Sequence, residues 1–254
     1  MTVDVAFEER GPMDAPPLIL ASSLGTTSEM WDAQVEPLSE QFRVIVYDHR
    51  GHGRSPVPPG PYTLEELARD VLSLMDRLTI GKASFAGLSL GGMVGMWLSA
   101  NAGDRVDRLA LLCTFAEVRS REMWRDRAAR VREAGTASMG DASIDRWFTP
   151  AFQAGHPAVV SRYREILAGI PDEGYAGCCE AIETMDLASS LDRIEAPTLV
   201  IAGSDDGGAT PEVMHSLTGA IPGARYAETK AAHLANVEQP GEVTGLLSEH
   251  FAGQ

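Results

Sequence analysis

The chain has 254 residues, of which 44% are hydrophobic and 22% charged, a composition typical of a single globular α/β domain. This composition excludes a disordered, collagen-like or disulfide-scaffold protein. The formal net charge of −15 also excludes a general nucleic-acid-binding protein, which needs a basic surface, and disfavours binding to an anionic membrane.

Short apolar runs alternate with helical patterns along most of the chain. Most of the runs are continuous apolar stretches, as expected for strands that are buried on both faces. Apolar residues three or four positions apart predict helices over 64–78, 90–102 and 240–251. The alternation therefore predicts a mostly parallel sheet with helices on both faces. The predicted strands are, in chain order, Val3–Glu8, Leu18–Ser22, Arg43–Tyr47, Ala83–Ala86, Arg108–Leu112, Thr198–Ala202 and Ala224–Glu228.

The alternation stops after Thr114 and resumes near Pro197. The stretch between them is mostly helical and rich in arginine, and it is too long to be one crossover helix. We therefore expect a helical cap insertion over residues 115–186. The α/β core would consist of residues 1–114 and 187–254.

The three cysteines, Cys113, Cys178 and Cys179, cannot form a fully paired disulfide framework, and we expect them to be packing residues in a reducing compartment. The first ten residues contain acidic side chains and no apolar stretch typical of a secretory signal. No uncharged apolar run approaches the length that spans a membrane. These features predict a soluble, cytoplasmic protein. They leave open whether it is a monomer or a homo-oligomer.

Residues 87–91 read Gly-Leu-Ser-Leu-Gly between a predicted strand and a predicted helix. This is the context of the G-x-S-x-G nucleophile elbow, in which a sharp turn holds a serine above the sheet at the start of a helix. Glycines are needed because side chains beside the strained serine would collide with nearby backbone. Ser89 is therefore the predicted nucleophile. The alternative is a tight turn with an incidental serine.

A nucleophilic serine needs a base, and the base needs an orienting acid, each on a loop after a later strand. Among the six histidines, His233 alone follows a late predicted strand directly, and it is the predicted base. A structural histidine is the alternative there. Asp205 and Asp206 follow the preceding predicted strand, and only one of them can point at the histidine. We favour Asp206, and expect the other to face solvent or to cap the next helix.

An oxyanion hole would combine the backbone N–H of Leu90, directly after the nucleophile, with that of Leu24 in the loop after an early strand. The segment Tyr47–Ser55 contains two histidines three residues apart on a Gly-rich loop. A metal site there is disfavoured, because no partner cluster is visible elsewhere. We expect a structural turn held by ion pairs.

Several segments together resemble the 3-oxoadipate enol-lactonase family of the α/β-hydrolase fold superfamily, over nearly the whole chain. They are SSLGTTSEMWD, YDHRGHGRS, PGPYTLEELARDVL, GLSLGGMVGMWL, RWFTPAF and AAHLANVEQP. The resemblance implies hydrolysis of β-ketoadipate enol-lactone to 3-oxoadipate in aromatic catabolism, through an acyl-enzyme and without a metal or an organic cofactor. The chain departs from the family at its N-terminus, where TVDVAFEER is directly a predicted strand and family members usually have a preceding strand and hairpin, so we expect the sheet to lack that edge strand.

The resemblance makes Trp124, Arg127, Arg146 and Trp147 the candidate residues that bind a small lactone or ester substrate. Their alternative role is a solvated helix face with the two tryptophans packed against the sheet. Other functions remain open: a carboxylesterase or lactonase for a different ring, a cofactor-free perhydrolase or haloperoxidase, or a small-molecule receptor with a slow triad. A strong preference for neutral esters, peroxide-dependent activity, or tight binding without turnover would indicate these in turn.

Overall fold

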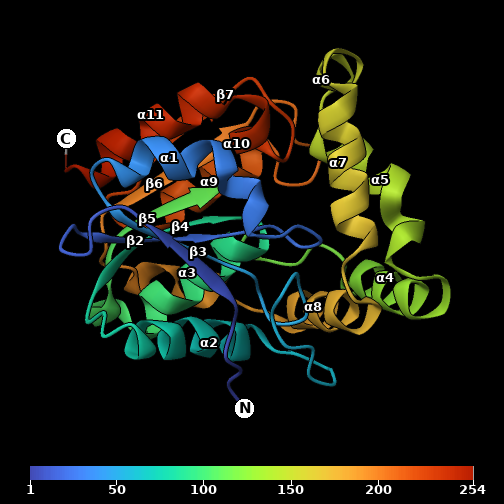
Figure 1. Cartoon of the computed structure of the whole chain (residues 1–254), viewed down its shortest axis with the longest axis horizontal. Coiled ribbons are helices and arrows are strands. Elements are labelled where there is room, and N and C mark those ends of the chain that lie inside the picture. Colours follow the sequence, from blue (N-terminus) through green and yellow to red (C-terminus); the bar gives the residue numbers. More distant parts are fainter. Residues whose placement is uncertain (254) are drawn as a thin grey trace.

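A seven-stranded sheet runs through the part of the chain that the computed structural model describes, residues 1–253 (Figure 1). The strand order is β1-β3-β2-β4-β5-β6-β7. β1 pairs with β3 in the antiparallel sense, and every other neighbouring pair is parallel, which confirms the predicted mostly parallel sheet. The strands are β1 (Phe7–Arg10), β2 (Pro17–Ala21), β3 (Arg43–Tyr47), β4 (Ala83–Leu88), β5 (Val106–Leu112), β6 (Thr198–Gly203) and β7 (Arg225–Thr229).

Helices cover both faces of the sheet: α1 and α11 lie over one face, and α2 and α3 over the other (Figure 1). The α-helices are α1 (Asp32–Ser39), α2 (Leu64–Arg77), α3 (Leu90–Asn101), α4 (Arg121–Ala134), α5 (Gly140–Trp147), α6 (Pro150–Gly155), α7 (Pro157–Ala168), α8 (Asp172–Thr184), α9 (Pro211–Ala220), α10 (Ala235–Glu238) and α11 (Pro240–Phe251). Short 3₁₀ helices are η1 (Ser28–Trp31), η2 (Gly103–Arg105), η3 (Thr136–Met139) and η4 (Ala188–Arg193).

Local sequence explains where α2 begins. Thr63 accepts a hydrogen bond from the Glu66 N–H, and the Glu66 carboxylate accepts one from the Thr63 N–H, so two of the unpaired donors at the helix start are satisfied. The apolar residues of the helix then bury one face against the sheet side. Within residues 1–253 no helix has the length and apolar character needed to cross a membrane.

The first strand differs from its predicted bounds, Val3–Glu8. Only Phe7–Arg10 pair with β3, opposite Val44–Tyr47. Val3 and Val5 bond to α2 instead: the Val3 N–H donates to Asp70 at 2.8 Å, and Arg77 donates to the Val5 carbonyl at 2.8 Å. The chain thus joins the sheet later than the apolar pattern indicates. Within residues 1–6 no strand precedes β1, which lies at the sheet edge as its antiparallel member.

The segment between β5 and β6 forms the helices α4 to α8, which lie together at one end of the sheet (Figure 1). Carboxyl ends of parallel strands meet at one edge, and loops there are where ligands bind in open α/β sheets. The helical segment is tied to that edge, because the Leu234 N–H after β7 donates to the Trp147 carbonyl at 3.0 Å. The loops with the candidate residues therefore lie between the sheet and these helices.

Candidate active site

Ser89 occupies a sharp turn between β4 and α3. Its backbone has φ +56°, a conformation that costs energy for any residue with a side chain. A Cβ on Gly87 would lie 2.1 Å from the Gly91 carbonyl oxygen, and a Cβ on Gly91 would lie 2.2 Å from that of Ala21. The positions two residues before and after Ser89 must therefore be glycine, as the elbow pattern predicts. The turn places Ser89 at the amino end of α3, where the helix dipole favours negative charge.

His233 and Asp206 meet at the edge of the sheet, on the loops after β7 and β6. The His233 Nδ1 and Asp206 Oδ2 atoms are 2.7 Å apart, and both side chains are buried. A carboxylate only accepts, so Nδ1 has the proton and Nε2 has a free lone pair. Nε2 is buried and has no hydrogen-bond partner within residues 1–253, as a proton acceptor awaiting a donor would.

The electrostatics of Asp206 favour its charged form. Burial by itself would raise the pKa of this carboxyl, but the charge and hydrogen bond of His233 and a hydrogen bond from the Gly208 N–H outweigh it, so the pKa lies below its ordinary value. The Gly208 and Ala209 N–H groups donate to Asp206 Oδ1 at 2.8 and 3.2 Å. Asp206 is thus held as an anion whose second oxygen is directed at the imidazole.

The neighbouring acid, Asp205, points away from this pair. It is exposed to solvent, and its carboxylate accepts a hydrogen bond from the Ser204 hydroxyl at 2.8 Å. Of the two adjacent carboxylates that the sequence offered, the structure brings Asp206 to His233.

The two predicted oxyanion donors are the Leu24 amide, in the loop after β2, and the Leu90 amide, at the start of α3. Leu90 is the first residue of α3, so its N–H has no partner in the helix. The Leu24 N–H, in the loop after β2, makes no hydrogen bond within residues 1–253. The Gly91 N–H donates to the Ser22 carbonyl at 3.1 Å and joins the two loops. Two unpaired donors are thus available for an oxyanion.

A cavity of about 360 Å³ opens between the loop after Asp206 and the helical segment. Its lining includes Trp124, Arg127 and Arg146, three of the four residues expected to bind substrate. Trp147, the fourth, lies elsewhere: it is fully buried and packs edge-on against Tyr163. The resemblance made both tryptophans candidates for the pocket, and of the two only Trp124 lines this cavity.

Two of the three arginines that line this cavity, Arg127 and Arg146, have buried donors without a partner and form no ion pair within residues 1–253. Arg127 stacks over the Trp124 ring at 4.9 Å, and its Nη1 atom is buried without a hydrogen-bond partner. Arg146 Nε is buried and unpartnered as well. Burial, and then the charge of Arg127, lower the pKa of Arg146. Two guanidinium groups with unused buried donors at a cavity form a site for an anion.

Sequence reasoning missed Glu238, which bridges the loop before His233 and the helical segment. One carboxylate oxygen accepts from the Thr149 N–H at 3.0 Å and its hydroxyl at 2.7 Å, and the other accepts from the Ala232 N–H at 2.5 Å. Glu238 was visible in the AAHLANVE segment. Its partner Thr149 is 89 positions away, so no local pattern could have indicated the bridge.

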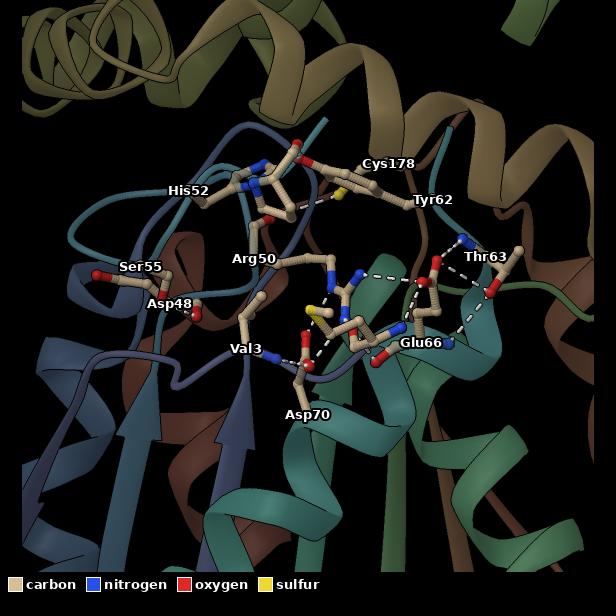
Figure 2. Close-up of polar contacts among 12 residues, drawn as sticks. Val3, Asp48, Arg50, His52, Ser55, Tyr62, Thr63, Glu66, Asp70 and Cys178 are labelled. Carbon is tan, nitrogen blue, oxygen red and sulfur yellow. Dashed lines mark hydrogen bonds and ion pairs between the residues drawn. The ribbon is translucent and has the colours of Figure 1, made fainter. Parts of the chain in front are cut away.

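The Tyr47–Ser55 loop is a structural turn held by ion pairs, as expected. Arg50 Nε lies 2.6 Å from Asp70 Oδ2, both side chains are buried, and Glu66 lies 3.5 Å from the same guanidinium (Figure 2). The Asp48 carboxylate accepts from the Arg54 N–H at 3.0 Å within the turn. The loop is therefore anchored to α2.

The sequence pattern of the alpha/beta hydrolase fold family matches residues 16–240. The chain belongs to that family. It is 39% identical to 3-oxoadipate enol-lactonase 2 of Acinetobacter baylyi over 230 residues, which are 91% of this chain and 86% of that protein.

Two solved structures agree. The enol-lactonase from Burkholderia xenovorans LB400 superposes with a TM-score of 0.97 at 42% identity, covering 98% of this chain and 97% of that one. A thermophilic esterase from Thermogutta terrifontis superposes with a TM-score of 0.94 at 33% identity, covering 98% and 93%. The predicted membership of the enol-lactonase family within the α/β hydrolases is confirmed, and this chain is an ester or lactone hydrolase.

Proposed function

We propose that this hydrolase opens 3-oxoadipate enol-lactone to 3-oxoadipate with Ser89 as nucleophile, His233 as base and Asp206 as orienting acid. The observation that carries the proposal is the pair of unpaired arginines, Arg127 and Arg146, at the cavity beside the His233–Asp206 pair. In a chain of net charge −15, an anionic substrate needs such a local cation. The similarity to enol-lactonases supports a lactone as the substrate, and the two guanidinium groups can bind the carboxylate of that lactone.

The first half of the reaction forms an acyl-enzyme. The Ser89 Oγ attacks the lactone carbonyl while its proton passes to His233 Nε2, whose other nitrogen is held by Asp206. The Leu24 and Leu90 N–H groups bind the carbonyl oxygen as it becomes negative. The ring C–O bond then breaks, and the leaving enolate takes the proton from His233 and tautomerises to the ketone.

In the second half, water attacks the acyl-enzyme. His233 Nε2 accepts a proton from the water and returns it to Ser89 as the acyl C–O bond breaks. The atoms balance with water as the one co-reactant, and the proposal needs no metal or organic cofactor. The partner that we propose for the protein is a small-molecule substrate.

We also propose that the protein is cytoplasmic, because its three cysteines are buried and unpaired, as in proteins of a reducing compartment.

The test is hydrolysis of enol-lactone generated in situ and followed by loss of ultraviolet absorbance, with spontaneous hydrolysis subtracted. Ser89→Ala should lower the turnover rate by several orders of magnitude. Ser99→Ala is the matched control, because Ser99 is also buried on α3 and lies ten residues from Ser89. It should leave turnover within about twofold of the wild type.

A neutral ester, p-nitrophenyl acetate, measured beside the lactone separates the proposal from its main alternative. A carboxylesterase function is the second candidate, because the similar Thermogutta protein is described as an esterase. That structure contains bound malate, a dicarboxylate, which agrees with an anion site in a relative. Turnover of the neutral ester without the lactone would retain the Ser89 mechanism and refute the lactone assignment.

A further inference from the structure

His49 and His52, in the loop after β3, contact the loop after β2 that contains Leu24. They bond to Ser22 and Gly25, the residues on either side of Ser23 and Leu24. His49 Nε2 donates to the Ser22 carbonyl at 2.9 Å. His52 Nε2 lies 3.1 Å from the Gly25 N–H. The residues on either side of Ser23 and Leu24 are thereby tied to side chains that come from another loop.

The tautomer of each ring follows from its partners. His52 Nδ1 lies 3.3 Å from the Arg50 carbonyl oxygen, which only accepts, so Nδ1 has the proton and Nε2 accepts from Gly25 (Figure 2). His49 Nε2 faces a carbonyl and must have the proton there. One ring thus donates to the loop and the other accepts from it.

Both rings are buried and neutral. Burial, and then the neighbouring His52, lower the pKa of His49 to about 3, and burial lowers the pKa of His52 to about 4. The neutral form suits the geometry, because a protonated His52 would present a second donor to the Gly25 N–H. Around neutral pH both rings therefore stay neutral, and His52 Nε2 remains an acceptor for the Gly25 N–H.

The anchored loop is also the one joined to the nucleophile turn. The Ser22 carbonyl accepts from the Gly91 N–H as well as from His49. Gly25 has φ +81°, and a Cβ there would lie 2.8 Å from the Leu167 side chain, so this turn favours glycine. The Leu24 N–H lies between these two fixed points. An oxyanion donor stabilises a transition state only when it is held at the position that the oxyanion will occupy.

We propose that His52, together with His49, is a positioning residue that holds the Leu24 N–H in the oxyanion hole. The inference rests on the proposed function, which assigns Leu24 as a donor. It gives the two histidines of the HRGH segment a role in the reaction although neither touches the substrate.

The test compares His52→Met with His52→Gln on p-nitrophenyl acetate and on the enol-lactone. Glutamine Oε1 can reach the position of the imidazole Nε2 and accept from the Gly25 N–H, whereas methionine cannot accept usefully. His52→Met should lower kcat about 10- to 100-fold with KM within about threefold, since the loss of a whole oxyanion donor costs about 10²- to 10³-fold. His52→Gln should restore kcat to within about threefold of the wild type.

The matched control is His250→Met. His250 is equally buried, donates from Nε2 to the Leu109 carbonyl at 3.0 Å, and has its pKa lowered by burial to about 4, but it belongs to α11 and bonds to β5 and not to the loop that contains Leu24. It should lower the melting temperature as His52→Met does, with kcat unchanged at 25 °C. A boronic acid that forms a tetrahedral adduct with Ser89 should bind His52→Met more weakly by the same factor as kcat falls.

Three results would overturn the inference: kcat retained in His52→Met, equal loss in His250→Met, or no rescue by glutamine. Should His52→Met not fold, His52→Asn replaces it, because its amide ends one carbon short of Gly25. Asparagine as active as glutamine would then refute the role. Ser89→Ala, run on the same ester, keeps the two hypotheses apart: an inactive Ser89→Ala beside a fully active His52→Met would refute the positioning role alone.

Discussion

Replacing Arg146 by methionine should separate substrates with a carboxylate from those without one. Methionine keeps an unbranched apolar stem in place of the arginine stem and removes the buried, unpartnered Nε donor and the charge. A hydrogen bond to a charged group contributes about 1.5–3 kcal/mol when both partners are desolvated. At about 1.4 kcal/mol for each factor of ten, kcat/KM for the enol-lactone should fall about 10- to 150-fold.

The same substitution should spare the neutral ester and the fold. Turnover of p-nitrophenyl acetate should stay within about threefold of the wild type, because that substrate has no carboxylate to pair with Arg146. The melting temperature should not fall, since the wild-type protein buries this cation without an ion pair and the substitution relieves that cost. Loss of binding energy without loss of stability is the expected sign of a site built for a ligand.

Arg119→Met is the control for a general effect of charge. Arg119 lines the same cavity but is exposed, so solvent and salt screen it and the lactone rate should change by less than about threefold. The assay measures kcat/KM for both substrates by loss of absorbance of the lactone and release of p-nitrophenol. An equal loss on both substrates in Arg146→Met would show a structural role, and an unchanged lactone rate would refute the anion site.

Three further predictions concern the acid pair, the anchored turn and the response to pH. Asp206→Asn should lower kcat about 10³- to 10⁴-fold by disturbing the imidazole tautomer, while Asp205→Asn should stay within about threefold; similar kinetics for both would refute the assignment. Asp70→Asn removes the buried partner of the Arg50 cation and leaves it only Glu66, 3.5 Å away and partly exposed, so it should lower the free energy of unfolding by about 3–5 kcal/mol in urea titrations, whereas a loss below about 1 kcal/mol would show the pair to be replaceable. His49 and His52, which hold the Ser22–Gly25 loop, have folded pKa values of about 3 and about 4, below the ordinary 6.5. Below about pH 6.5 these histidines become protonated in the unfolded chain but not in the folded one, so the free energy of unfolding falls as the pH drops. Between pH 7 and pH 5 they should together remove about 4 kcal/mol from the free energy of unfolding, and a flat urea stability profile over that range would contradict their burial as neutral rings.

Local sequence was enough to predict most of the fold. Strand and helix patterns depend on residues that are near in the chain, so β2 to β7 and the helices α2, α3 and α11 lie within a few residues of their predicted bounds. The elbow was predictable for the same reason: Gly87, Ser89 and Gly91 occupy one turn, and the clash that requires glycine is between neighbouring backbones. His233 was identified by its place directly after a strand.

Tertiary structure decided what local patterns could not. Asp205 and Asp206 are the same residue type at adjacent positions, and they differ in where their side chains point. Only the contact with His233, 27 residues further along the chain, distinguished Asp206 from Asp205. The amphipathic pattern placed Arg127 on a helix but could not show that it and Arg146 share a cavity without a carboxylate partner. Sequence determines the chemistry that is available, whereas the unpaired charge and the support of the oxyanion loop arise where distant segments pack, because burial is a property of the whole fold.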